Sequence, residues 1–229
     1  MPYPITELAY GLRFRLSDLA TPAERYRLQE AAGNQTICPP KLQSIRIKDD
    51  VFLQHENGKL IASYYDDEHD LYRKPVLTDK ADDLAYCPSI IIRLMKVENI
   101  KGDLLNQVIL RPRKLFLEDG DDLSPTFFEL LQSKFPIADV RSLKVRMILN
   151  VLNPLDLLSV FTYLPRLEHL DILGLAPNTW MSDILKSQKQ KLSSLTIDVY
   201  SDSLENGAIE KLVDFMKVTF YCMASHSGN

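Results

Sequence analysis

The chain has 229 residues, 45% of them hydrophobic and 25% charged, so it is long and apolar enough to form a sizeable core. Its formal net charge is −4 and it has no long run of Lys and Arg, which removes the usual electrostatic basis for binding nucleic acid. Cys38, Cys87 and Cys222 form no C-x-x-C pair. This argues against a disulfide framework and against a zinc site.

The sequence shows no signal for export or for a membrane. The first eleven residues contain a glutamate and two prolines, where a signal peptide has a basic start followed by an apolar run. No apolar stretch approaches the roughly 20 residues of a membrane-spanning helix. We therefore expect a cytoplasmic protein, with the nucleus as the alternative, that has no membrane partner and no nucleic-acid partner.

Residues 1–40 predict a small helical head of two helices. Pro4 can start the first helix, in which apolar residues three or four apart form one face: Ile5, Leu8, Leu12, Leu16 and Leu19. The second helix begins at Thr21-Pro22, where Thr21 is the N-cap, Pro22 is at N1 and Glu24 completes a capping box. Leu28 continues this helix, Gly33-Asn34 is a typical stop, and Pro39-Pro40 marks the end of the head.

Residues 41–108 predict a β-hairpin followed by a buried strand. The hairpin is expected around Asn57-Gly58, because this dipeptide lies between runs that alternate apolar and polar residues. The segment CPSIIIRLMKV that starts at Cys87 is rich in β-branched residues and predicts the buried strand. The acidic segment 66–70 between them is expected to be a solvated loop.

Residues 109–229 contain an irregular repeat of one strand and one helix. The first apolar anchors of the strands are Leu115, Leu143, Leu170 and Leu195, and the second anchors are Leu117, Val145, Ile172 and Ile197. Both sets advance by 28, 27 and 25 residues. This period and the L-x-L strands are typical of leucine-rich repeats, so we expect an α/β solenoid, with a doubly wound sheet as the alternative.

The helices between these strands are expected to start at Ser124-Pro125, Asn153-Pro154, Pro177-Asn178 and Asn206-Gly207. Trp180 lies at the start of one of them and is expected to pack against a neighbouring repeat. Arg111, Arg113 and Lys114 form a small basic group for which we expect a solvated edge rather than a ligand site.

No pattern of reactive side chains predicts catalysis. The sequence contains no phosphate-binding glycine loop, no H-E-x-x-H and no G-x-S-x-G. His55, His69, His169 and His226 are scattered, and neither 66–70 nor 118–122 has the ligand spacing of a calcium loop. We expect no enzyme, no metal and no cofactor; a hydrolase or metal enzyme is the alternative that would require a pocket of convergent polar groups.

A helical head, a proline-marked boundary and irregular leucine-rich repeats occur here in the order found in F-box/leucine-rich-repeat proteins. The segment PITELAYGLRFRLSDLATPAERYRLQEAAGN resembles the F-box, and it also resembles the head of a nematode family of F-box-like pharynx regulators. The resemblance implies an α/β leucine-rich solenoid with an F-box-like head that binds the adaptor Skp1 in a ubiquitin ligase. The implied adaptor-binding residues are Pro4, Ile5, Leu8, Leu12, Leu16, Pro22 and Leu28.

The repeats would then hold an unknown protein target. Parallel strands of such an array line one concave face, and the residues between the apolar anchors point out of it. The expected partner-binding residues are Lys144, Arg146, Glu168, His169, Asp171, Thr196 and Asp198. The alternative is a cytoplasmic developmental regulator that acts by protein binding without Skp1, in which the head only caps the repeats.

Overall fold

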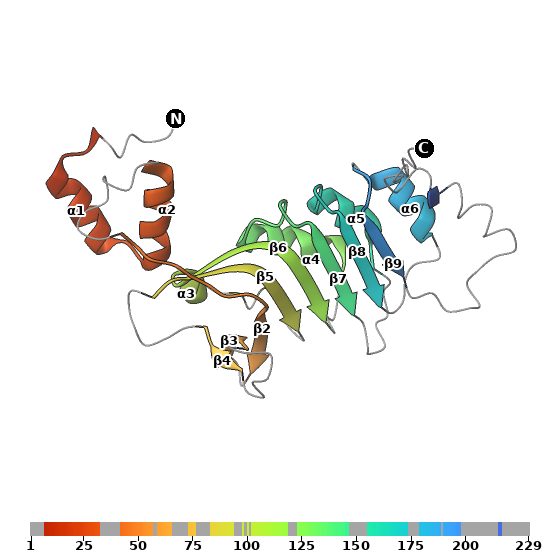
Figure 1. Ribbon diagram of the computed structural model, residues 1–229, viewed down its shortest axis with the longest axis horizontal. Helices are drawn as coiled ribbons and strands as arrows, with labels where there is room; N and C mark the ends of the chain where they lie inside the picture. The colour runs from red at the N-terminus through yellow and green to blue at the C-terminus, as the bar shows by residue number, and fades with distance from the viewer. Residues whose placement is uncertain are drawn as a thin grey trace, which may run out of the picture.

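A computed structural model describes residues 7–32, 42–56, 59–65, 73–76, 83–93, 98, 100, 102–118, 123–146, 155–173, 179–188, 190–197 and 215–216. The head consists of α1 (Tyr10–Leu19) and α2 (Pro22–Ala32). It lies at one end of an elongated molecule, beside the start of the sheet (Figure 1). The first helix thus begins at Tyr10, later than the sequence predicted, and Leu8 precedes it. Pro4, Ile5 and Gly33-Asn34 lie outside the described residues.

The capping box at the start of α2 is confirmed. The backbone N–H and the hydroxyl of Thr21 both donate to Glu24 Oε2, at 2.8 and 2.9 Å, and the N–H of Glu24 donates back to the Thr21 hydroxyl at 3.3 Å. These hydrogen bonds satisfy N–H groups that the first turn of a helix leaves without an intrahelical partner. The start of α2 is therefore fixed by its local sequence.

After the head, the described residues up to 93 form five strands, and those from 102 to 197 form four more strands and four helices. The first five strands are β1 (Arg46–Ile47), β2 (Val51–Glu56), β3 (Lys59–Tyr64), β4 (Lys74–Pro75) and β5 (Ala85–Arg93). They are followed by α3 (Gly102–Leu105), β6 (Val108–Glu118), α4 (Pro125–Lys134), β7 (Ser142–Arg146), α5 (Leu157–Tyr163), β8 (His169–Leu173), α6 (Trp180–Ser187) and β9 (Ser194–Ile197).

All the strands of the described chain form one open, mixed sheet, so the prediction of an α/β protein is confirmed. The sheet has the order β4-β3-β2-β5-β6-β7-β8-β9, and β1 pairs with β5 outside this path. Strands β5 to β9 are parallel to their neighbours, whereas β2 and β3 form the expected antiparallel hairpin, with Glu56 opposite Lys59. Strands from before and after residue 108, the end of the segment predicted to hold the hairpin, belong to this one sheet, because β5 pairs along the length of β6.

The apolar anchors of the repeat stand in register across the parallel strands. Leu115, Leu143, Leu170 and Leu195 are consecutive partners on β6, β7, β8 and β9, and so are Leu117, Val145, Ile172 and Ile197. The pairing register is the same between each pair of neighbouring strands, so each anchor lies opposite the equivalent anchor of the next strand. The steps of 28, 27 and 25 residues read from the sequence are therefore the spacings between paired residues on neighbouring strands.

Helices α4, α5 and α6 cover one face of this parallel part, as Figure 1 shows. Their apolar residues, including Phe128, Leu131, Val160 and Ile184, pack on the anchors to form a core that continues to the hairpin residues Val51 and Leu53. Pro125 follows the N-cap Ser124 as predicted for α4. The N-cap of α5 is Asp156, and Asn153-Pro154, Pro177-Asn178 and Asn206-Gly207 lie outside the described residues.

Trp180 packs as expected for a structural residue. It begins α6, is buried, and meets the ring of Phe215 edge-on at a centroid distance of 5.2 Å. Within the described part of the chain, no helix is both long and apolar enough to cross a membrane.

Candidate interaction surfaces

Helix α1 exposes an unusual amount of apolar surface. None of its residues is buried, and its large apolar side chains are exposed: Tyr10, Leu12, Phe14, Leu16 and Leu19. Leu12 is 58% exposed and Leu19 is 77% exposed. Single exposed leucines are common on protein surfaces, but five large apolar residues exposed on one ten-residue helix need a physical explanation.

The apolar residues of α1 occupy two sides of the helix. Leu12, Leu16 and Leu19 follow one another at i, i+4 and i+7, so they share the side that the sequence predicted. Tyr10 and Phe14, at i and i+4, lie on a different side that the leucine spacing alone did not reveal. Leu8, just before the helix, is half-buried. Both apolar sides of α1 remain open to solvent.

Helix α2, in contrast, packs against the sheet of its own chain. Pro22 and Ala23 are buried, and Ala23 forms a small apolar cluster with Leu84 and Ile109. Tyr26, Ile45 and Tyr86 pack around this cluster, and the N–H of Ala23 donates to the carbonyl of Asn106 at 3.1 Å. Leu28 is half-buried. Of the described residues expected to bind the adaptor, Pro22 is thus the one most fully covered by the chain itself.

An ion pair completes the attachment of α2. Arg111, on β6, donates from Nη1 and Nη2 to the two carboxylate oxygens of Glu30 at 2.8 and 2.7 Å. These hydrogen bonds raise the pKa of Arg111, while burial and then the nearby charge of Glu30 raise the pKa of Tyr26. The sequence had suggested that Arg111 lies at a solvated edge. Its side chain is 42% exposed, in agreement with that expectation, and its ion pair also joins the head to β6.

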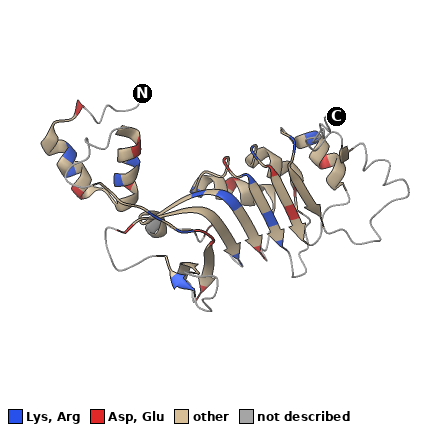
Figure 2. Ribbon diagram, viewed as in Figure 1, with Lys and Arg blue, Asp and Glu red and all other residues tan. Residues whose placement is uncertain are grey.

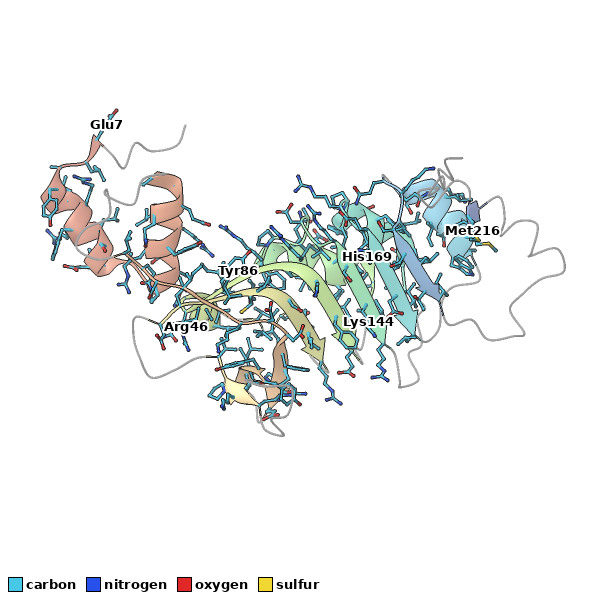
Figure 3. The ribbon with its side chains drawn as sticks, viewed as in Figure 1. Glu7, Arg46, Tyr86, Lys144, His169 and Met216 are labelled. Carbon is cyan, nitrogen blue, oxygen red and sulfur yellow. The ribbon has the colours of Figure 1, made fainter. Side chains whose placement is uncertain are left out.

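The second surface is the face of the parallel sheet opposite the helices, here called the open face. Its residues alternate with the buried anchors along β6 to β9: Lys114, Phe116, Glu118, Ser142, Lys144, Arg146, His169, Asp171, Leu173, Ser194 and Thr196. Lysine and arginine bands on β6 and β7 lie next to an acidic band on β8 (Figure 2). Figure 3 labels Lys144 and His169 on the neighbouring strands β7 and β8.

The strand register arranges the open face in three rows. The first row is Lys114, Ser142, His169 and Ser194; the second is Phe116, Lys144, Asp171 and Thr196; the third is Glu118, Arg146 and Leu173. Neighbouring strands lie about 4.8 Å apart, so consecutive members of one row are next to one another on the face. The sequence predicted five of these residues, Lys144, Arg146, His169, Asp171 and Thr196, as parts of one surface, and they do lie together.

Opposite charges pair within the second and third rows. Lys144 Nζ lies 3.3 Å from Asp171 Oδ2 and 5.6 Å from the centre of the Phe116 ring. Glu118 lies between two arginines, 3.8 Å from Arg146 Nη1 and 3.4 Å from Nε of Arg93 on β5. The partly exposed pair Lys144–Asp171 contributes about 0–1 kcal/mol to stability. The Glu118 side chain is only 12% exposed, and its two arginines fix its position and the local charge.

The first row has no acidic member. His169 Nδ1 lies 2.9 Å from the hydroxyl of Ser194, and both side chains are exposed. Lys114 is exposed and forms no ion pair with any residue that the structure describes. A lysine, a histidine and two serines in register offer hydrogen-bond donors with no carboxylate among them, which is an arrangement suited to an anionic group. On β5 the row continues to Ser89, whose hydroxyl donates to Asp50.

Glu168 differs from the other predicted contact residues. Its carboxylate accepts a hydrogen bond from Arg141 Nη1 at 3.2 Å, in the turn before β8. The pair Arg166–Asp139, with 2.5 Å between Nη1 and Oδ1, connects the same two repeats, and both pairs span 27 residues, which is the repeat step. Glu168 thus belongs to a set of turn contacts between repeats rather than to the open face. Asp198 lies outside the described residues.

The remaining candidate chemistry concerns metal ligands and the thiol of Cys87. No group of three or more His, Cys, Asp or Glu residues with metal-binding geometry occurs among the residues that the structure describes. Segment 66–70 and residues 119–122 lie outside them. Cys87 is buried on β5, and burial, together with the charge of Asp49, raises its pKa to about 12. A thiol with so high a pKa is a poor nucleophile at neutral pH.

Comparison with known proteins gives no match: neither a family model, nor a curated protein, nor a solved structure is significantly similar to this chain. What the chain binds is therefore inferred from the geometry of its own two surfaces, the apolar helix α1 and the open face of the sheet.

Proposed function

We propose that this chain is a non-enzymatic protein-interaction module that binds one protein through α1 and another through the open face of its sheet. The observation that carries the proposal is that α1 buries none of its residues while it exposes five large apolar side chains. Burying one leucine or phenylalanine side chain contributes about 1.5–3 kcal/mol. A partner that covers even one side of α1 would gain several such contributions from a few anchor residues.

The partner proposed for α1 is a Skp1-like adaptor, so that the chain would be a substrate receptor of a ubiquitin ligase. This proposal rests on the resemblance of the head to an F-box and on the leucines that α1 offers to solvent. Among the predicted adaptor-binding residues that the structure describes, Leu12 and Leu16 are the most accessible. Pro22 and Leu28 are less available to an adaptor, because they belong to α2, which is already packed on the sheet.

For the second half of the chain we propose an irregular leucine-rich-repeat array, extended at its start by the hairpin. Three features support this proposal: the L-x-L anchors are in register, consecutive strands are neighbours, and a helix on the same face follows each of β6, β7 and β8. In such arrays the strand face away from the helices recognises protein targets. The open face would accordingly hold the target.

Isothermal titration of the full chain with purified Skp1 tests the adaptor proposal. Because Leu12 and Leu16 are exposed, glutamate at both positions should leave the fold intact and weaken binding at least tenfold, which corresponds to about 1.4 kcal/mol. Leu158→Glu is a matched control, since Leu158 is a similarly exposed leucine on α5, and it should bind as the wild type does. Absence of heat at micromolar concentrations of the wild-type chain would refute the adaptor proposal.

A second candidate function is a cytoplasmic developmental regulator that binds proteins without Skp1, as in the nematode family that the head resembles. The attachment of α2 to the sheet favours it, because a head that caps the repeats must be fixed to them. Deletion of residues 1–40 would then uncover Leu84 and Ile109 and lower the solubility of the remaining chain. Unchanged solubility and stability of the truncated chain would exclude capping as the role of the head.

A further inference from the structure

The open face carries a positive surplus although the chain as a whole is negative. Among the residues of β5 to β9 that the structure describes on this face, there are four cations, Arg93, Lys114, Lys144 and Arg146, and two anions, Glu118 and Asp171. The formal net charge of the whole chain is −4. A local surplus of two positive charges on such a chain attracts acidic partners and orients them.

The surplus is located at two separate points. The second row is neutral, because Lys144 pairs with Asp171. The third row has one extra cation, since Glu118 is shared between Arg93 and Arg146. The first row has one extra cation, Lys114. Lys114 and Glu118 are four residues apart on β6, so the two points are separated by about 13 Å along the strands at roughly 3.3 Å per residue.

We propose that the open face binds an extended acidic segment of a partner protein, with acidic residues at positions i and i+4 and an apolar residue at i+2. This inference rests on the proposed function and names the kind of target that the sheet takes. Residues i, i+2 and i+4 of an extended chain project to one side and span about 13 Å, the separation of the two cationic points. The middle residue then lies over Phe116, which is half-buried between the charged rows.

The donors of the first row strengthen this assignment. A carboxylate that approaches Lys114 meets the hydroxyl of Ser142 on the next strand and the imidazole of His169 on the one after. Hydrogen bonds from a charged donor to a carboxylate are about twice as strong as neutral ones. At the other end, the acidic residue at i+4 pairs with Arg146 or Arg93. These two arginines have only one carboxylate, that of Glu118, between them.

The same charge pattern disfavours nucleic acid. A phosphate backbone carries a charge on every nucleotide and requires a continuous cationic track. Asp171 and Glu118 interrupt any such track across the second and third rows. Two separate anionic groups with an apolar group between them match the face better than a uniform polyanion does.

Fluorescence anisotropy tests the proposal with the full chain and a labelled peptide that has two glutamates four residues apart and a leucine midway. The acidic peptide should bind more tightly than the peptide with glutamine in place of both glutamates. Lys114→Gln and Arg146→Gln should each weaken binding about two- to fivefold, as expected for loss of one exposed ion pair. Lys186→Gln, an exposed lysine on α6 and therefore on the helix-covered side, is the matched control and should have no effect.

Several results would overturn the inference. They are equal affinity for the glutamine peptide, equal affinity for an oligothymidylate of the same charge, wild-type affinity of both Lys114→Gln and Arg146→Gln, or no binding of the acidic peptide. Thermal melting of the variants, followed by circular dichroism, should match that of the wild type, because both side chains are exposed or half-exposed. None of these results depends on α1, so the adaptor titration distinguishes failure of this inference from failure of the proposed function.

Discussion

Substitution of Ile109 by alanine should selectively loosen the head from the sheet. Ile109 is 3% exposed and packs with Ala23 and Leu84, which are each 1% exposed. An isoleucine-to-alanine change in a core costs about 2–5 kcal/mol, depending on how far the cavity collapses. We expect about 2 kcal/mol here, because the cluster is small and the half-buried Tyr26 and Tyr86 can move toward the space. For a chain of this length, that corresponds to a fall in Tm of about 4–8 °C.

The assay is urea unfolding combined with hydrogen exchange of α2. Ile109→Ala should raise the exchange rates of residues 22–32 more than those of β7, because only the head loses its contact surface. Ile137→Ala is the matched control: Ile137 is fully buried in the main core, so its loss should cost more stability without a preference for α2. A loss below about 0.5 kcal/mol for Ile109→Ala, with unchanged exchange of α2, would refute the attachment of the head through this cluster.

Three further predictions concern single sites. The hydrogen bonds from the backbone N–H and then from the hydroxyl of Thr21 lower the pKa of Glu24 from its usual 4.5. The stabilisation of α2 by the ionised Glu24 is therefore fully present above pH 4.5 and is lost as the pH falls through the lowered pKa. Glu24→Ala should therefore lower stability in urea unfolding at pH 7 by less than about 1 kcal/mol, and by less still near pH 2. Burial raises the pKa of Cys87 to about 12, so peptide mapping should find it unalkylated by iodoacetamide at pH 8 when folded but alkylated in urea. Phe215→Ala should shift the fluorescence of Trp180, the chain's one tryptophan, to longer wavelength; an unchanged spectrum would contradict the ring contact.

Features fixed by neighbouring residues could be predicted from the sequence. The capping box of Thr21 and Glu24 depends on residues three positions apart, and the hairpin with Glu56 opposite Lys59 depends on its turn. The repeat anchors could be predicted because every unit repeats the same local pattern, so their period alone aligns the strands. The polar residues between the anchors then had to share one face.

Features that join distant segments could not be predicted in the same way. Arg111 and Glu30 are 81 residues apart, and nothing near either residue indicates the other. The parallel pairing of β2 with β5 also follows from the packing of the whole sheet rather than from a turn. The late start of α1 at Tyr10 reflects a third limit: its leucines keep a helical spacing, but spacing does not decide where a helix that buries none of its residues begins.

The proposal that α1 is a binding helix is tested most directly by hydrogen exchange of residues 10–19 with and without Skp1. Because α1 has no buried residue while α2 is attached to the sheet, residues 10–19 should exchange faster than residues 22–32 in the free chain. They should become protected when Skp1 is added in micromolar excess. Equal protection of α1 and α2 in the free chain, or no change in α1 on addition of Skp1, would contradict the proposal.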